Sequence, residues 1–114
     1  MMVEVNASER ELVMREFEQI KFDVQDWAHL EKCAHFELIQ EKGDRISIHV
    51  YNASRHINVV KTLTSQQSAC LRQCFLAAET DSWTDPFLHE HLLLDRYSWT
   101  LGVYADERYY MCLS

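Results

Sequence analysis

The spacing of apolar residues changes along the chain and predicts where helices and strands lie. In the N-terminal quarter these residues recur every three or four positions, which is the spacing of one helix face: Val13, Phe17, Ile20 and Val24. Ser8 and Glu11 have the spacing of a capping box and predict that the helix begins there. The pattern fits either one bent helix or two helices, the second capped by Asp23 or Asp26.

After residue 35 the pattern alternates, which indicates strands. The clearest example is Ile46, Ile48 and Val50, which alternate with Ser47, His49 and Tyr51. Shorter apolar segments near 36–39 and 57–60 predict two more strands, with turns at 42–44 and 52–54. Thr64 and Gln67 form a second capping box, and the helix that follows is expected to end near Glu79.

The C-terminal segment alternates again. Trp99, Leu101 and Val103 predict a strand, residues 105–108 a turn, and residues 109–113 the returning strand. The pattern therefore predicts one α+β domain over residues 1–114, with the element order α-β-β-β-α-β-β. We expect an N-terminal helix (or two) and a mainly antiparallel sheet of about five strands with one central helix.

Composition narrows the class of function. The chain has two glycines, Gly43 and Gly102, and one proline, Pro86. Phosphate-cradling loops need several glycines close together, because glycine lets the backbone approach a ligand closely. We therefore expect a binding protein without a cofactor rather than an enzyme. No apolar run approaches the roughly 20 residues of a membrane span, and no signal pattern opens the chain, so we expect a cytoplasmic protein that contacts no membrane.

Acidic residues are concentrated toward both ends of the chain, which has a net charge of -7. Residues 45–78 contain no acidic and four basic residues, whereas residues 1–44 and 79–114 contain eleven and seven acidic residues. Such a surface repels nucleic acid and attracts a basic protein. The acidic side chains expected to contact that partner are Glu9, Glu11, Glu16, Glu18, Asp95, Asp106 and Glu107.

Aromatic residues crowd the predicted C-terminal hairpin. Tyr97, Tyr104 and Tyr109 offer large, rigid contact areas with a polar tip, which is typical of binding hot spots. We predict that they join the acidic residues in a partner-binding surface.

Other residues suggest chemistry but favour simpler interpretations. His89 and His91 have the spacing of metal ligands on a strand, but no second ligand pair accompanies them, so we expect no bound metal. Cys70 and Cys74 share one face of the central helix and are expected to pack in the core as reduced thiols. His49, His56 and Lys61 are residue types that can cleave RNA by acid–base catalysis. The alternative from the enzyme class is therefore a small His-dependent enzyme, either a metal-dependent hydrolase using His89 and His91 or a ribonuclease using His49 and His56.

One segment resembles a known protein class. The run Leu94-Asp95-Arg96-Tyr97-Ser98-Trp99-Thr100-Leu101, a turn that leads into a Trp-containing strand, resembles small bacterial immunity proteins of polymorphic or contact-dependent toxin systems. Arg96 stands where such segments often have glycine. The resemblance implies a protein that binds a cognate basic toxin, of nuclease type, and blocks its active site or substrate path.

The element order offers a second resemblance. A helix, three strands, a helix and two strands in a small acidic chain are similar to class I type III secretion chaperones, although the final helix of that family is missing. That resemblance implies a dimer that wraps an effector segment. A phage-encoded acidic inhibitor has a similar composition and is a further alternative. The oligomeric state is left open by the sequence.

Overall fold

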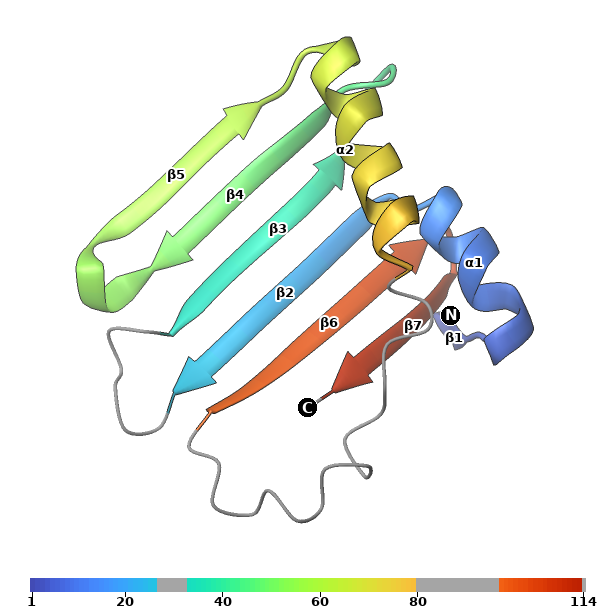
Figure 1. The fold of residues 1–114 in the computed structure, drawn as a ribbon, viewed down its shortest axis with the longest axis horizontal. Helices are drawn as coiled ribbons and strands as arrows, with labels where there is room; N and C mark the ends of the chain where they lie inside the picture. The colour runs from blue at the N-terminus through green and yellow to red at the C-terminus, as the bar shows by residue number, and fades with distance from the viewer. Residues whose placement is uncertain (27–32, 80–96, 114) are drawn as a thin grey trace.

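The computed structural model describes residues 1–26, 33–79 and 97–113, which form one sheet with two helices packed on one of its faces (Figure 1). The elements follow the chain as β1 (Val3–Glu4), α1 (Ala7–Arg15), β2 (Gln19–Asp26), β3 (Ala34–Gln40), β4 (Ile46–Asn52), the 3-10 turn η2 (Ala53–Arg55), β5 (Ile57–Thr62), α2 (Ser65–Ala78), β6 (Tyr97–Ala105) and β7 (Arg108–Leu113).

The sheet has seven strands in the order β1-β7-β6-β2-β3-β4-β5. Every neighbouring pair is antiparallel except β1 and β7, which run parallel. The expectation of about five strands with one central helix is therefore wrong, because the described residues form seven strands and two helices and are mostly β.

Strand β2 accounts for much of the difference. Its residues had been assigned to a helix because Phe17, Ile20 and Val24 are three and four positions apart. In the structure α1 ends at Arg15, and Gln19–Asp26 pairs with β3 on one side and β6 on the other. Ile20, Phe22 and Val24 are also two positions apart, so the same residues fit a strand once flanking strands can satisfy its backbone groups.

Of the two predicted helix starts, the structure confirms that of α2 and corrects that of α1. The N-cap of α1 is Asn6, whose side chain accepts a hydrogen bond from the Glu9 backbone N–H, so the predicted start at Ser8 is wrong by two residues. Asparagine caps as well as serine does, and here Ser8 donates its hydroxyl to Asn6. At α2 the capping box of Thr64 and Gln67 is confirmed, and Glu79 is the C-cap.

The core lies between the helices and the sheet. Its fully buried apolar members come from α1, from the connection between α1 and β2, and from strands β2, β4, β6 and β7: Val13, Phe17, Ile20, Ile46, Leu101, Val103, Tyr110 and Cys112. Phe17, in the connection between α1 and β2, makes an edge-on ring contact with Phe75 of α2, with the centroids 6.1 Å apart. Burial of these side chains fixes which face of each strand points toward the helices, and the alternate residues point to the other face.

Arg72 of α2 joins the helices to the sheet. Its guanidinium lies over the Phe17 ring at 4.0 Å and donates to the backbone oxygens of Arg15 and Phe17 and to the side chain of Gln40. Ser68, one turn earlier, is buried and accepts a hydrogen bond from the Ile46 backbone N–H at 2.8 Å. These contacts hold α2 on the sheet and leave the opposite sheet face without either helix (Figure 1).

Candidate protein-binding face

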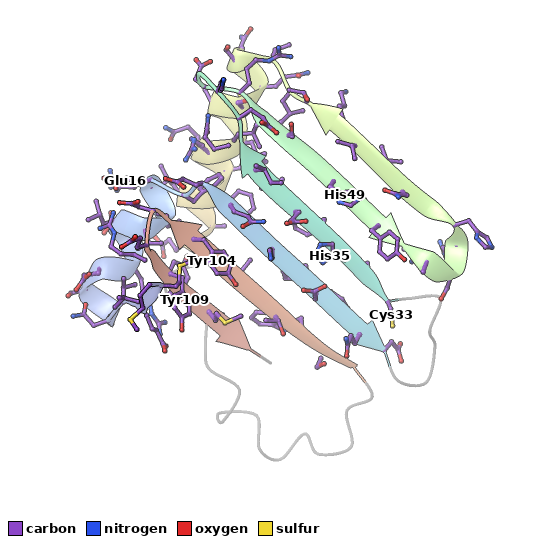
Figure 2. All side chains as sticks on the ribbon, turned by 180° about the vertical axis from the view of Figure 1, so that it is seen from behind. Glu16, Cys33, His35, His49, Tyr104 and Tyr109 are labelled. Atoms are coloured by element: carbon purple, nitrogen blue, oxygen red, sulfur yellow. The ribbon has the colours of Figure 1, made fainter. Side chains whose placement is uncertain are left out.

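The sheet face opposite the helices carries polar and aromatic side chains (Figure 2). Side chains alternate along each strand, so strand registers assign these residues to one face. We call this surface the open face. Its residues come from six strands: Gln19, Lys21 and Asp23 of β2; His35, Glu37 and Ile39 of β3; Ser47, His49 and Tyr51 of β4; Asn58, Val60 and Thr62 of β5; Thr100, Gly102 and Tyr104 of β6; and Tyr109 and Met111 of β7.

His35 lies near the middle of the open face between two carboxylates. Its Nδ1 atom is 2.6 Å from Oδ1 of Asp23, and its Nε2 atom is 3.4 Å from Oε2 of Glu37. Gln19 donates its side-chain N–H to the other oxygen of Glu37. The side chains are partly exposed, at 26% for His35, 46% for Asp23 and 19% for Glu37, so they form a fixed charge group that solvent and a partner can reach.

The carboxylates change the ionisation of His35. Partial burial of the ring lowers its pKa, but the hydrogen bonds and charges of Asp23 and Glu37 outweigh burial, and the pKa is raised above its ordinary value. In the protonated form each ring nitrogen faces a carboxylate.

His49 and Tyr51 continue the same row of side chains on β4. The His49 ring stands edge-on to His35 with centroids 6.5 Å apart, and the Tyr51 ring lies 6.4 Å from His49. The Nε2 atom of His49 is 2.7 Å from Oδ1 of Asn58, which fixes the orientation of the ring. Figure 2 shows His35 and His49 side by side on neighbouring strands. A hollow of about 170 Å³ begins beside them, lined by Asp23, Cys33, His35, Tyr51, Asn52 and Ser54 among others.

Two tyrosines form the other half of the open face. The Tyr104 and Tyr109 rings stack with centroids 5.9 Å apart and an angle of 20° between their planes. The Lys21 ammonium lies 5.9 Å from the Tyr104 ring. Tyr104 lies across Gly102, where a Cβ atom would come within 2.8 Å of the tyrosine hydroxyl. Glycine at residue 102 therefore leaves the space that the Tyr104 ring occupies.

The structure separates the predicted tyrosines from the predicted N-terminal acids. Tyr104 and Tyr109 lie on the open face, whereas Glu9 and Glu11 lie on α1, on the other side of the sheet (Figure 2). Glu11 forms an ion pair with Arg15 at 2.7 Å, and Glu16 forms one with Arg108 at 3.0 Å. Glu18 is exposed between α1 and β2, and its backbone N–H donates to the backbone carbonyl oxygen of Tyr104.

The C-terminal acids occupy a sheet corner. Asp106 and Glu107 form the exposed turn between β6 and β7, where Asp106 has a positive φ of 56°. The Glu107 carboxylate lies 3.9 Å from the N-terminal ammonium group of Met1. Tyr97 begins β6, which confirms a strand in the Trp-containing segment, and Asp95 lies outside the described residues. Asp106 and Glu107 therefore lie at the rim of the open face rather than at its centre.

The central residues of the open face were not predicted as a site. The helical spacing predicts Asp23 or Asp26 as the cap of a second helix and predicts no role for His35 or Glu37. The sequence pattern that could have identified these residues is the alternation of polar with apolar residues in 20–24 and 34–38. In adjacent strands this alternation places the polar residues on one side of the sheet.

The other candidate chemistry has mixed outcomes. His89 and His91 lie outside the described residues, and within 1–26, 33–79 and 97–113 no group of three possible metal ligands occurs. His49 faces the open side of the sheet, whereas Lys61 pairs with Ile48 and points to the helix side, so the two do not meet in a ribonuclease-like site.

Cys70 and Cys74 are exposed on α2, so the expectation of core packing is wrong for both; Cys112 is buried.

Comparison with known proteins gives no relative for this chain: no family, no curated protein and no solved structure matches it. Among the described residues, neither helix is long and apolar enough to span a bilayer.

Proposed function

We propose that this chain is a protein-binding domain that docks a basic protein on its open face and thereby neutralises it. The specific form we propose is an immunity protein that blocks a basic, nuclease-type toxin. The observation that carries the proposal is the open face itself, where polar, charged and aromatic side chains are held in place by one another on one side of a seven-stranded sheet.

The ordering of these side chains supports binding. Tyr104 and Tyr109 are stacked on each other, and Gly102 leaves room for Tyr104. Aromatic side chains that are already fixed lose little conformational entropy when a partner packs on them. Tyrosine is also among the residues that most often dominate binding energy. The tyrosine pair is therefore suited to act as the anchor of an interface.

Charge supports a basic partner. Asp23 and Glu37 provide carboxylates at the centre of the open face, where an arginine or lysine of a partner can form charge-assisted hydrogen bonds. Exposed acids at the rim, including Asp106 and Glu107, add long-range attraction. Attraction of this kind speeds association and suppresses acidic partners. A toxin that binds nucleic acid has a basic surface for the same physical reason.

Photo-crosslinking in the source cells tests the proposal. A photoreactive residue is placed at Thr100 or Met111 on the open face, and at Ala69 on the exposed side of α2 as the matched control. We expect the two open-face positions to crosslink the same basic protein and the Ala69 position to give little product. The captured protein is then purified, and its affinity is measured for the wild type and for Tyr104→Ala, which should bind at least about tenfold more weakly.

Co-expression decides whether binding neutralises the partner. Production of the captured protein alone should stop cell growth, and the wild-type chain should restore growth while Tyr104→Ala should not. Equal crosslinking from Ala69, capture of an acidic protein, or unchanged binding by Tyr104→Ala would contradict docking on the open face. Normal growth with the captured protein alone would contradict the immunity role.

A further inference from the structure

Strand β5 ends the sheet and is unusually exposed. In the sheet order it has one neighbour, β4, and all six of its residues are exposed. Val59 and Val60 are 54% and 67% exposed, although valine is normally placed inside. Figure 1 shows β5 at the opposite end of the sheet from α1, β1 and β7.

The backbone of β5 offers hydrogen bonds to another strand. The Leu63 N–H donates to the Ile46 oxygen at 2.8 Å, so Leu63 points its backbone groups toward β4. Backbone direction alternates along a strand, and the β4–β5 register has no interruption. Asn58, Val60 and Thr62 therefore direct their N–H and C=O groups away from β4, toward the edge.

Edge strands in soluble proteins are usually protected by charges, proline or bulges. Within β5 the single charged residue is Lys61, and its side chain is on the helix side. No proline or bulge interrupts the strand. An unprotected, regular edge with exposed valines is a ready template for pairing with another strand.

We propose that two copies of this chain pair through β5, antiparallel, around a twofold axis perpendicular to the sheet. Such an axis places the open face of one copy beside the open face of the other. Each open-face residue of β5 must therefore lie opposite an open-face residue of the second copy. With Val60 opposite Val60 of the second copy, Asn58 is opposite Thr62, and every outward backbone group on both strands is paired. The product is one continuous sheet of double width with one continuous open face.

Charge agrees with a second copy as the occupant. Residues 45–78 contain no acidic residue, and the acidic residues of α1 and of the β6–β7 turn lie at the far end of the sheet, so pairing through β5 keeps these acids of the two copies apart. In this register Lys61 is opposite Val59, not opposite its own counterpart. The axis also brings η2 of one copy, with exposed Arg55, to the start of α2 of the other, where Ser65 is bonded to exposed Asp44. Opposite charges therefore meet at both ends of the interface.

Oligomeric state tests this proposal independently of the proposed toxin. We expect sedimentation analysis of the wild type to show a mass near twice 13.5 kDa at high concentration, which falls toward 13.5 kDa on dilution. Val60→Pro removes an outward N–H without touching the bonds to β4, and Val60→Lys opposes two charges on the axis. Both variants should be monomeric at concentrations where the wild type is dimeric. Val3→Lys, an apolar-to-lysine change on β1 at the opposite edge, should dimerise normally.

Amide hydrogen exchange of the wild type tests the same inference without any variant, so the test still decides if a β5 variant fails to fold. In the wild type the amides of Asn58, Val60 and Thr62 should exchange at least about tenfold more slowly at high than at low protein concentration. The inference is wrong if the wild type is monomeric at every concentration, if both Val60 variants remain dimeric, or if exchange of these amides does not depend on concentration. Protection of the same amides by a partner protein alone would assign the edge to a partner strand instead.

Discussion

The Nδ1 atom of His35 on β3 lies 2.6 Å from Oδ1 of Asp23 on β2, and this pair marks the centre of the open face. Glu37 faces the other ring nitrogen, so a histidine stands between two carboxylates on the sheet face opposite α1 and α2. The arrangement holds Asp23 and Glu37 apart and oriented while leaving them reachable. It also makes the stability of the protein depend on pH.

The sign of that dependence follows from the raised pKa of His35. Below about pH 6.5, the ordinary pKa of an unfolded histidine, the ring is charged in both states and its ion pairs contribute fully. As pH rises through the higher pKa of the folded protein, the charge and this contribution are lost. We expect the free energy of unfolding of the wild type to fall over that range by at most about 1 kcal/mol relative to His35→Gln.

Titration of His35 by NMR checks the cause. Asp23→Asn removes the partner whose hydrogen bond raises the pKa most, and the His35 pKa should fall in that variant. An unchanged His35 pKa in Asp23→Asn would mean that the carboxylate does not control the ring.

The two glycines make a matched pair of tests for the tyrosine anchor. In Gly102→Ala the added Cβ meets the Tyr104 ring, which must shift from the position in which it stacks on Tyr109. We expect at least about tenfold weaker binding of the partner, since an ordered hot-spot residue is displaced. Gly43 has a positive φ of 79° with open space around it, so Gly43→Ala should cost about 1 kcal/mol of stability and leave binding unchanged. Titration calorimetry and urea unfolding give both quantities, and the reverse pattern would contradict the role of Tyr104.

Ser68 is expected to be a large single contributor to the attachment of α2. Ser68→Ala leaves the Ile46 N–H without its acceptor and should lower the free energy of unfolding by about 1–3 kcal/mol. Ser65→Ala removes an exposed hydroxyl bonded to Asp44 and should change stability by less than about 0.5 kcal/mol. Urea unfolding of both variants measures the difference. Equal losses would show that another contact satisfies Ile46.

Arg72 should not be replaceable by lysine. Its planar guanidinium serves several acceptors while lying on the Phe17 ring, and one ammonium group cannot reproduce that geometry. We expect Arg72→Lys to lower the free energy of unfolding by about 1–2 kcal/mol. Arg55→Lys, on the exposed turn η2, provides the control and should be neutral. If thermal and urea unfolding show that Arg72→Lys leaves the free energy of unfolding unchanged, the positive charge alone accounts for the contribution of Arg72.

Local signals were sufficient for much of the fold. Alternation located β3, β4, β5 and the β6–β7 hairpin, and the capping box located α2, because these elements carry their own pattern. The N-terminal elements could not be assigned this way. Ile20 and Val24 satisfy helical and strand spacing together, and pairing of β2 with β3 and with residues about eighty positions later decides between them.

The same ambiguity hid the centre of the site. Tyr104 and Tyr109 were predicted as contact residues because the hairpin around them was recognised. Asp23 and His35 meet only when β2 is a strand beside β3, so assigning residue 23 to a helix separated them. The N-terminal acids were grouped with the tyrosines by charge, and the sheet places Glu9 and Glu11 behind it.

Methyl NMR of the complex tests docking on the open face most directly. The Ile39 and Met111 methyl groups report on the open face, and the Leu12 methyl groups report on the exposed side of α1; these side chains are 37%, 37% and 43% exposed. When the partner captured from cells is added, we expect the Ile39 and Met111 signals to shift and the Leu12 signals to stay in place. Shifts at Leu12 with unchanged signals from Ile39 and Met111 would contradict the account, because the partner would then bind the helix side.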